Sequence, residues 1–171
     1  MQQIIRPAVP LTDAELERFG REHAGCKVER ESDGSLVVSP VTTEGGGKNF
    51  ELTVQLGRFV DVAGGKGFDS SVGFTLPDGA VLSPDASWIS PERYASLTRE
   101  ALRSYARVVP DLWIELRSQS DRVAVLRSKL LRVRGFGAAY VVLIDPFARH
   151  AWSDGEPPQG FTLDLEAIYD A

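Results

Sequence analysis

The stretch "PDLWIELRS", residues 110–118, places three charged side chains on a short apolar segment that is typical of a buried strand. These are Asp111, Glu115 and Arg117. Charge in the interior of a strand is costly unless it is paired or bound to an ion, so the stretch predicts a site as well as a strand. Side chains alternate along a strand, which puts Glu115 and Arg117 on one side. The opposite, core-facing side then carries Leu112, Ile114 and Leu116.

The residues that follow predict a helix and a second strand. "DRVAVLRSKLLRVR", residues 121–134, carries apolar side chains at helical spacing, with Ser120 as the expected N-cap. "AAYVVLI", residues 138–144, is an unbroken apolar run, as expected of a strand that is buried on both faces. A strand, a helix and a strand in this order favour parallel pairing with a right-handed crossover.

The upstream sequence completes a mixed α/β layer arrangement. A helix is expected over residues 48–63. The glycine-rich stretch "TEGGGKNF", which overlaps its start, lacks key residues of a phosphate-binding loop, so we interpret it as a flexible lead into that helix. Strands are expected over residues 68–76 and 80–89, joined by a turn at Pro77-Asp78-Gly79, and a helical insertion over residues 90–107. The predicted order is helix, three strands, helix, strand.

Two more elements are predicted at the N-terminal end. Thr12 and Glu15 have the spacing of a capping box, so a helix is expected over about residues 13–22. The runs "KVERES" and "SLVVSP" flank an Asp-Gly pair and predict a β-hairpin.

The composition is that of one globular domain over residues 1–171, with 43% hydrophobic and 25% charged residues. One cysteine excludes an internal disulfide, and with only two histidines it argues against a zinc site. No signal peptide or membrane span is predicted, so we expect a soluble, cytoplasmic protein without a membrane partner.

The charge is unevenly distributed. The net charge of −5 argues against a nucleic-acid partner, whereas residues 93–134 carry ten Lys or Arg against four Asp or Glu, a net of +6. Solvated helix faces explain this basic segment as well as a phosphate-binding surface does, and the sequence leaves both open.

A second Pro-Asp pair, in "SPDASWI" at residues 83–89, offers Glu115 a partner. Asp111 shares a strand with Glu115 and lies roughly 13 Å from it, too far to share an ion whose ligand oxygens sit about 2.0 to 2.1 Å away. Asp85, on an adjacent strand about 4.8 Å away, is close enough. We therefore expect Asp85 and Glu115 to form the carboxylate pair, with Asp111 as a polar residue at the start of the strand. The alternative is an ion pair between Glu115 and Arg117 at a sheet edge.

These motifs together resemble a known family. "SPDASWI" and "PDLWIELRS", followed by a helix containing "SKL" and then by "VVLIDP", are similar to the Uma-two family of endonucleases, in the restriction-endonuclease-like superfamily with its PD-(D/E)XK motif. The resemblance runs from the hairpin "KVERESDGSLVVSP" to "FTLDL" near the C-terminus. It implies a mixed β-sheet flanked by helices, in the element order predicted above.

The resemblance also implies roles for individual residues. Asp85 becomes the motif aspartate, Glu115 the acidic residue of (D/E)XK, and position 117 that of the motif lysine. Arg117 departs from the motif, and because arginine keeps its proton it can hold a phosphate but not act as a general base. Lys129 matches a lysine of family members, or is a solvated surface lysine. Glu29 matches a family glutamate and adds a third carboxylate.

Two functions from different classes follow. The first is a magnesium-dependent (or manganese-dependent) endonuclease that hydrolyses DNA, with Asp85, Glu115, Arg117 and Lys129 as catalytic residues. The metal ligands would be Asp85, Glu115, Glu29 and the Leu116 carbonyl. Cutting of both strands would favour a homodimer. The second is a non-catalytic descendant of the fold that binds nucleic acid or a partner protein. A purely structural ion pair is a third, weaker alternative.

Overall fold

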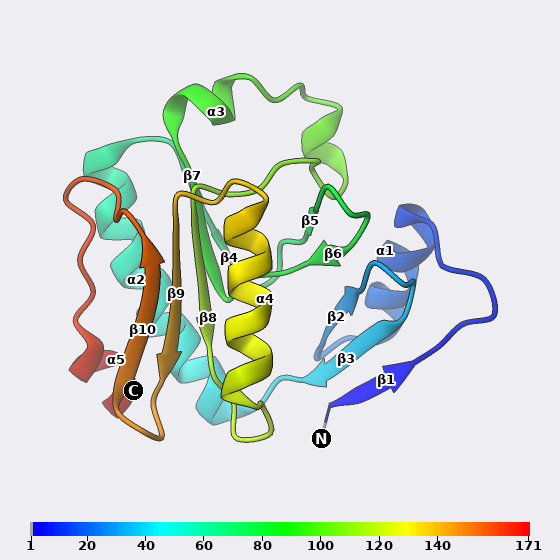
Figure 1. The fold of residues 1–171 in the computed structure, drawn as a ribbon, viewed down its shortest axis with the longest axis horizontal. Coiled ribbons are helices and arrows are strands. Elements are labelled where there is room, and N and C mark those ends of the chain that lie inside the picture. Colours follow the sequence, from blue (N-terminus) through cyan, green and yellow to red (C-terminus); the bar gives the residue numbers. More distant parts are fainter. Residues whose placement is uncertain (1) are drawn as a thin grey trace.

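The computed structural model describes residues 2–171, and its central element is a five-stranded sheet (Figure 1). The strand order is β10-β9-β8-β7-β4. The strands β8 and β9 pair in parallel and α4 connects them, as the sequence predicted, while the other pairs are antiparallel. The strands are β4 (Lys66–Asp69), β7 (Ala86–Ile89), β8 (Leu112–Leu116), β9 (Tyr140–Asp145) and β10 (His150–Gly155).

Helices cover both faces of this sheet. Figure 1 shows α4 (Val123–Gly135) crossing one face, and α2 (Thr43–Ala63) lying behind the other with α5 (Leu165–Asp170) beside it. Alternation along β8 places Trp113 in the core on the α4 side and Ile114 in the core on the α2 side. The expectation of a single core-facing side was therefore wrong, because Glu115 also points into a buried layer.

A second five-stranded sheet, entirely antiparallel, stands beside the first in the order β1-β3-β2-β6-β5. Its hairpin and the helix α1 (Asp13–Glu22) confirm the predicted N-terminal elements. Leu16 of α1 packs against Leu36 and Val81 of the sheet. The strands are β1 (Gln3–Ile5), β2 (Cys26–Arg30), β3 (Leu36–Pro40), β5 (Phe74–Thr75) and β6 (Val81–Leu82).

The two strands predicted over residues 68–76 and 80–89 each divide between the sheets. The first becomes β4 and β5, and the second becomes β6 and β7. The chain crosses from one sheet to the other at Ser83 and Pro84, so Asp85 stands at the junction. A change of sheet cannot be recognised in a continuous run of β-forming residues. The two halves of such a run have the same composition, and only their hydrogen-bonding partners differ.

Two helix boundaries differ from the predictions. The helix α2 begins at Thr43, where the Thr42 hydroxyl accepts a bond from the Gly45 N–H, so the glycine-rich stretch is helical rather than a flexible lead. The N-cap of α4 is Arg122 rather than Ser120, whose hydroxyl lies 3.2 Å from that of Ser118. The insertion is helical in pieces, as predicted, with α3 (Pro91–Ala95) and a 3-10 turn (Ala101–Arg103).

The sequence did not predict β1, β10 or α5. The strands β1 and β10 are edge strands of their sheets, and α5 is a short helix. Across residues 2–171, none of the helices combines the length and apolar character needed to cross a lipid bilayer.

Candidate functional site

A cavity of about 560 Å³ opens where the two sheets and α4 meet. Five of the charged side chains that line it lie together, and we call them the charge cluster: Lys27, Glu29, Asp85, Glu115 and Lys129. They come from β2, the junction before β7, β8 and α4. Four sequence-predicted site residues are therefore brought together, although up to 100 positions separate them along the chain.

Asp85 is fixed against the end of β8 by backbone bonds. Its N–H donates to the Ile114 carbonyl at 2.9 Å, and its Oδ2 accepts from the Leu116 N–H at 2.7 Å. These bonds continue the antiparallel pairing of β7 with β8 by one residue, which sets Asp85 opposite Glu115 and holds its carboxylate there. Asp85 is 8% exposed and so reaches solvent only through the cavity.

Glu115 lies on the α4 side of β8 and is almost completely buried, with 3% exposure. Its Oε1 accepts from the Trp113 indole N–H at 2.8 Å and contacts the Lys129 Nζ, also at 2.8 Å. Both partners share its layer, because Trp113 precedes it by two positions on the strand and Lys129 faces the strand from α4.

Lys129 bridges two carboxylates. Besides Glu115, its ammonium group donates to the Glu29 Oε1 at 2.9 Å, which also accepts from the Ser83 N–H at 2.8 Å. The side chain of Lys129 is 13% exposed. The alternative of a solvated surface lysine is therefore wrong, and this lysine ties α4 to both sheets.

Sequence reasoning missed Lys27, which completes the cluster. Its Nζ donates to the Asp85 Oδ1 at 3.1 Å, and its side chain is 18% exposed. Lys27 precedes Glu29 by two positions on β2 and so projects from the same face of that strand. This spacing is the signal that would have found it once Glu29 had been chosen.

Burial and pairing compete in setting the pKa values of the cluster. Burial raises the pKa of the Glu115 carboxyl, and the nearby Lys129 and Lys27 ammonium groups offset only part of that effect. Burial also opposes the charge of Glu29, but Lys129 and Lys27 outweigh it and hold the pKa of Glu29 below its usual value. The pKa of Lys129 is raised, because the two carboxylates outweigh its own burial.

The charge cluster offers the oxygen ligands of a magnesium site, but its two lysines already pair with all three carboxylates. Carboxylate and carbonyl oxygens are the ligands that Mg²⁺ prefers. Three carboxylates and two ammonium groups leave a formal charge of −1, so the cluster retains an excess of negative charge. Within residues 2–171, no three His, Cys, Asp or Glu side chains lie in an arrangement that would hold a metal ion. An ion would therefore have to take the place of a lysine contact.

Arg117 lines the same cavity but pairs away from the carboxylates of the cluster. Its Nη1 donates to both oxygens of Asp145 at 3.1 Å, and its Nε donates to the Asp121 carbonyl at 3.1 Å. The alternative of a Glu115–Arg117 ion pair is therefore wrong. Asp145, the aspartate of "VVLIDP", is the partner of this arginine.

Asp111 lies at the other end of β8. Its carboxylate accepts from the Ser90 N–H at 2.8 Å and pairs with Arg93 at 2.6 Å. The interpretation as a polar residue at the start of the strand is confirmed, and Asp111 belongs to the α3 connection rather than to the charge cluster.

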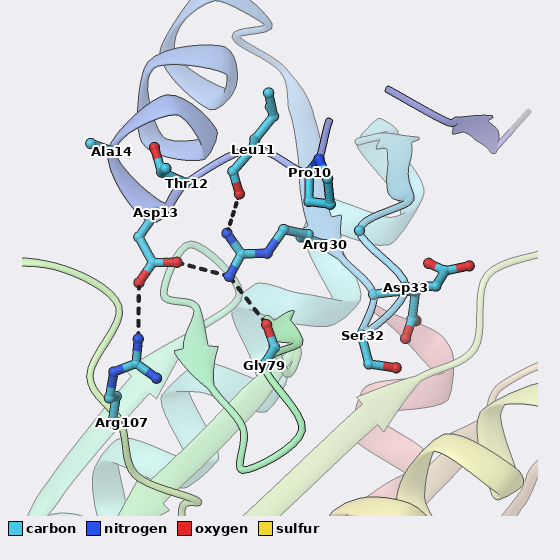
Figure 2. Close-up of a pocket in the computed structure, with 12 residues that line it drawn as sticks. Pro10, Leu11, Thr12, Asp13, Ala14, Arg30, Ser32, Asp33, Gly79 and Arg107 are labelled. Carbon is cyan, nitrogen blue, oxygen red and sulfur yellow. Dashed lines mark hydrogen bonds and ion pairs between the residues drawn. The ribbon is translucent and has the colours of Figure 1, made fainter. Parts of the chain in front are cut away.

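A second cavity, of about 650 Å³, lies between α1 and the hairpin and is shown in Figure 2. At its centre, the Arg30 guanidinium donates to the Leu11 carbonyl at 2.7 Å, to Asp13 at 2.8 Å and to the Gly79 carbonyl at 3.1 Å. Arg107, 3.8 Å from Asp13, lies at the edge. The Arg30 guanidinium is bonded to three neighbouring parts of the fold. This larger cavity is therefore the weaker candidate for a catalytic site.

Comparisons with known proteins bear on the family and the fold. The family model of Uma2, described as "Putative restriction endonuclease", matches residues 13–162. Among solved structures, the chain is similar to a crystal structure of a "putative nuclease" from Anabaena variabilis ATCC 29413, with a TM-score of 0.64 and 17% identity. The likeness covers 84% of this chain and 89% of that chain, and at this identity it bears on the fold alone. A search of the curated proteins finds no match.

The resemblance to the Uma-two family and the mixed α/β, restriction-endonuclease-like fold are therefore confirmed. The matched range takes in most of the chain, including all five residues of the charge cluster. The chain belongs to the Uma2 family, which is described as "Putative restriction endonuclease".

Proposed function

We propose that this protein is a magnesium-dependent endonuclease that hydrolyses DNA phosphodiester bonds at the charge cluster. The observation that supports the proposal is the convergence of Glu29, Asp85, Glu115 and Lys129 in one cavity of a chain from this nuclease family. Burying three carboxylates together opposes folding, and a cation-dependent reaction gives a reason for the arrangement.

Asp85 and Glu115 are the proposed primary ligands, with Glu29 and the Leu116 carbonyl as further ones. When bound, magnesium would polarise the phosphoryl oxygen and lower the pKa of the attacking water. The backbone bonds of Asp85 keep its carboxylate beside Glu115 while a ligand is exchanged. Lys27 holds Asp85 through one contact at 3.1 Å, so it is the lysine whose displacement costs least.

Lys129 is proposed to supply the ammonium group that the motif places on the strand. In this chain that strand position holds Arg117, and Lys129 reaches Glu115 from the helix instead. A fixed positive charge beside the carboxylates would offset the negative charge that develops on the phosphate in the transition state. Arg117, anchored by Asp145, is proposed to hold a phosphate and not to move a proton.

A cleavage assay with matched variants tests the proposal. Plasmid and single-stranded DNA are incubated with magnesium or manganese, and Asp85→Ala and Glu115→Ala are compared with wild type. We expect either substitution to lower the rate by at least about a hundredfold, because loss of groups that hold a metal has effects of this size or larger. Asp61→Ala, an exposed aspartate of α2, should cleave like wild type. Undiminished cleavage by Asp85→Ala would refute the proposal.

The alternative is a non-catalytic descendant that binds nucleic acid or a partner protein. Arginine at position 117 and lysines on all three carboxylates favour it, because a charge-compensated cluster is stable without metal. Titration with manganese, followed by calorimetry, separates the two functions. Only the nuclease requires a divalent site that disappears in Asp85→Ala and Glu115→Ala.

Cutting of both DNA strands would require two sites. The expectation of a homodimer therefore belongs to the proposal, and sedimentation with and without duplex DNA tests it.

A further inference from the structure

An exposed aromatic ring stands at the rim of the cavity that holds the charge cluster. Phe147 lies in the turn between β9 and β10, lines the cavity, and is 48% exposed. Its neighbours in the lining include Pro146 and the exposed Val41. A ring that is 48% exposed leaves about half of its surface open to the solvent beside a charged pocket, so packing within the chain does not fully account for its position.

The backbone that carries the ring is anchored, and a cation lies over the ring. The Asp145 Oδ1 accepts bonds from the backbone N–H groups of Phe147 and Ala148, both at 3.1 Å. The Arg117 guanidinium lies over the ring, 5.3 Å from its centroid, and is itself fixed by Asp145. One carboxylate thus anchors both the turn that carries the ring and the cation that lies over it. A pre-organised aromatic surface loses little conformational entropy when a ligand binds.

The depth of the cavity limits what can reach the cluster. Glu115, Asp85 and Glu29 are only 3%, 8% and 9% exposed, whereas Phe147 and Val41 are exposed at the rim. A volume of about 560 Å³ lies within the range of small-molecule pockets and suits a single nucleotide. A phosphate bound at the carboxylates would leave its base in the same cavity, which Phe147 also lines. In an intact duplex that base is paired and stacked, and it must leave the stack to enter.

We propose that Phe147, backed by Arg117, stacks a nucleobase next to the cleaved phosphate, and that the preferred substrate is therefore single-stranded DNA. This inference rests on the proposed nuclease function and names its substrate. Aromatic rings with nearby arginines are the means by which proteins hold single strands without reading their sequence. The anchored charge of Arg117 also complements the phosphate that accompanies the base.

Binding and cleavage measured with matched phenylalanine variants test the inference. The binding probe is a fluorescein-labelled, hydrolysis-resistant oligothymidylate of about ten nucleotides, within the ~4–16 nucleotides that single-strand grooves cover. A duplex of the same length is the comparison, and magnesium is present in both. We expect Phe147→Ala to weaken single-strand binding about tenfold and to change duplex binding by less than about twofold, as the loss of one base stack would. The same selectivity is expected for kcat/KM on cleavable DNA.

Two further variants keep the result interpretable. Phe147→Trp should retain single-strand affinity, because an indole also stacks on bases. Phe50→Ala removes another exposed ring, 71% exposed on α2 and outside the lining of the cavity, and should bind like wild type. Both phenylalanines are exposed, so their removal should leave the thermal stability nearly unchanged.

The outcomes separate this inference from the function on which it rests. A wild-type protein that prefers duplex, or a Phe147→Ala variant that binds single strands like wild type, overturns the stacking inference while cleavage still supports the nuclease. Equal losses on both substrates also overturn it. Selective loss of single-strand binding in a protein that cleaves nothing with any divalent metal supports the stacking inference and refutes the nuclease.

Discussion

Lys129 is the residue on which the charge cluster depends. Its ammonium group is the only bridge between Glu29 and Glu115 among the hydrogen bonds and ion pairs of residues 2–171. A buried ion pair adds little stability compared with apolar residues, but removing one partner leaves an uncompensated buried charge. The lysine therefore contributes far more to the fold than an ordinary surface lysine, whatever its part in the proposed reaction.

We predict that Lys129→Met lowers the free energy of unfolding by about 3 kcal/mol, because two buried carboxylates lose their shared partner. Urea denaturation measures this change. Magnesium should recover part of the loss if the freed carboxylates bind the ion, since a ligand of the native state stabilises it.

Lys66→Met is the control, because Lys66 is exposed on β4 and its substitution should cost little. The double variant Lys129→Met/Glu115→Gln should be less destabilised than the sum of the single changes, because the two side chains are in contact. Equal stability of Lys129→Met and Lys66→Met would contradict the bridging role.

At the scale of single elements, α1 shows how far local sequence goes. The Thr12 hydroxyl accepts from the Glu15 N–H at 3.3 Å, and the Glu15 carboxylate accepts from the Thr12 N–H at 2.8 Å. This is the capping box that the spacing predicted, and the helix begins and ends where expected. The Thr12 N–H and the Thr12 hydroxyl both donate to the Glu15 carboxylate at 2.8 Å, and these two bonds hold the pKa of Glu15 below its usual value.

This lowered pKa gives a pH dependence with a definite sign. Glu15 binds a proton less readily in the folded chain than in the unfolded chain, so its contribution is fully present above its unfolded pKa of 4.5 and is lost as the pH falls from that value through the lower pKa of the folded chain. We predict that wild type loses more stability than Glu15→Gln between about pH 6 and about pH 3, a range around the ordinary glutamate pKa.

Urea denaturation at several pH values measures this difference. Glu22→Gln, at the exposed C-terminal end of the same helix, should keep the wild-type acid sensitivity. If Glu15→Gln and Glu22→Gln lose stability in parallel, the capping bond does not set the pKa.

At the scale of the whole molecule, arginines join the parts that strand pairing leaves separate. Arg30 of β2 holds the segment before α1 to the turn at Gly79, as Figure 2 shows. Arg132 of α4 contacts Glu31 at 2.8 Å and Asp78 at 2.6 Å, which connects the helix of one sheet to two turns of the other. The cavity of the charge cluster lies between the sheets that these contacts hold together.

We predict that Arg30→Met loosens α1 without unfolding the central sheet. Arg30 is 9% exposed and makes three bonds, so its loss should cost about 2 kcal/mol, in the range for hydrogen bonds to charged groups. Hydrogen exchange should become faster in residues 13–22 and stay slow in β8 and β9. Arg18→Met, an exposed position on α1, serves as the control. Uniformly faster exchange across the chain would show that Arg30 stabilises the whole fold instead.

The predictions that succeeded rest on local chemistry. Capping residues, the Asp-Gly turn and unbroken apolar strands act over a few neighbouring positions, and they placed α1, the hairpin and the parallel pair of β8 and β9. The motif resemblance identified the family and the residues Glu29, Asp85, Glu115 and Lys129. Their proposed roles in catalysis and metal binding remain predictions.

Tertiary structure decided the partners of those residues. It divided two predicted strands between two sheets, assigned Lys27 to Asp85 and Lys129 to two carboxylates, and turned Arg117 toward Asp145. Contacts between positions 58 to 100 apart follow from how the sheets and α4 pack, which no local pattern records. The sequence alone determined which chemical groups the chain has for a site, and packing determined which of them meet, because a charge in a buried layer pairs with whatever partner the neighbouring element brings within reach.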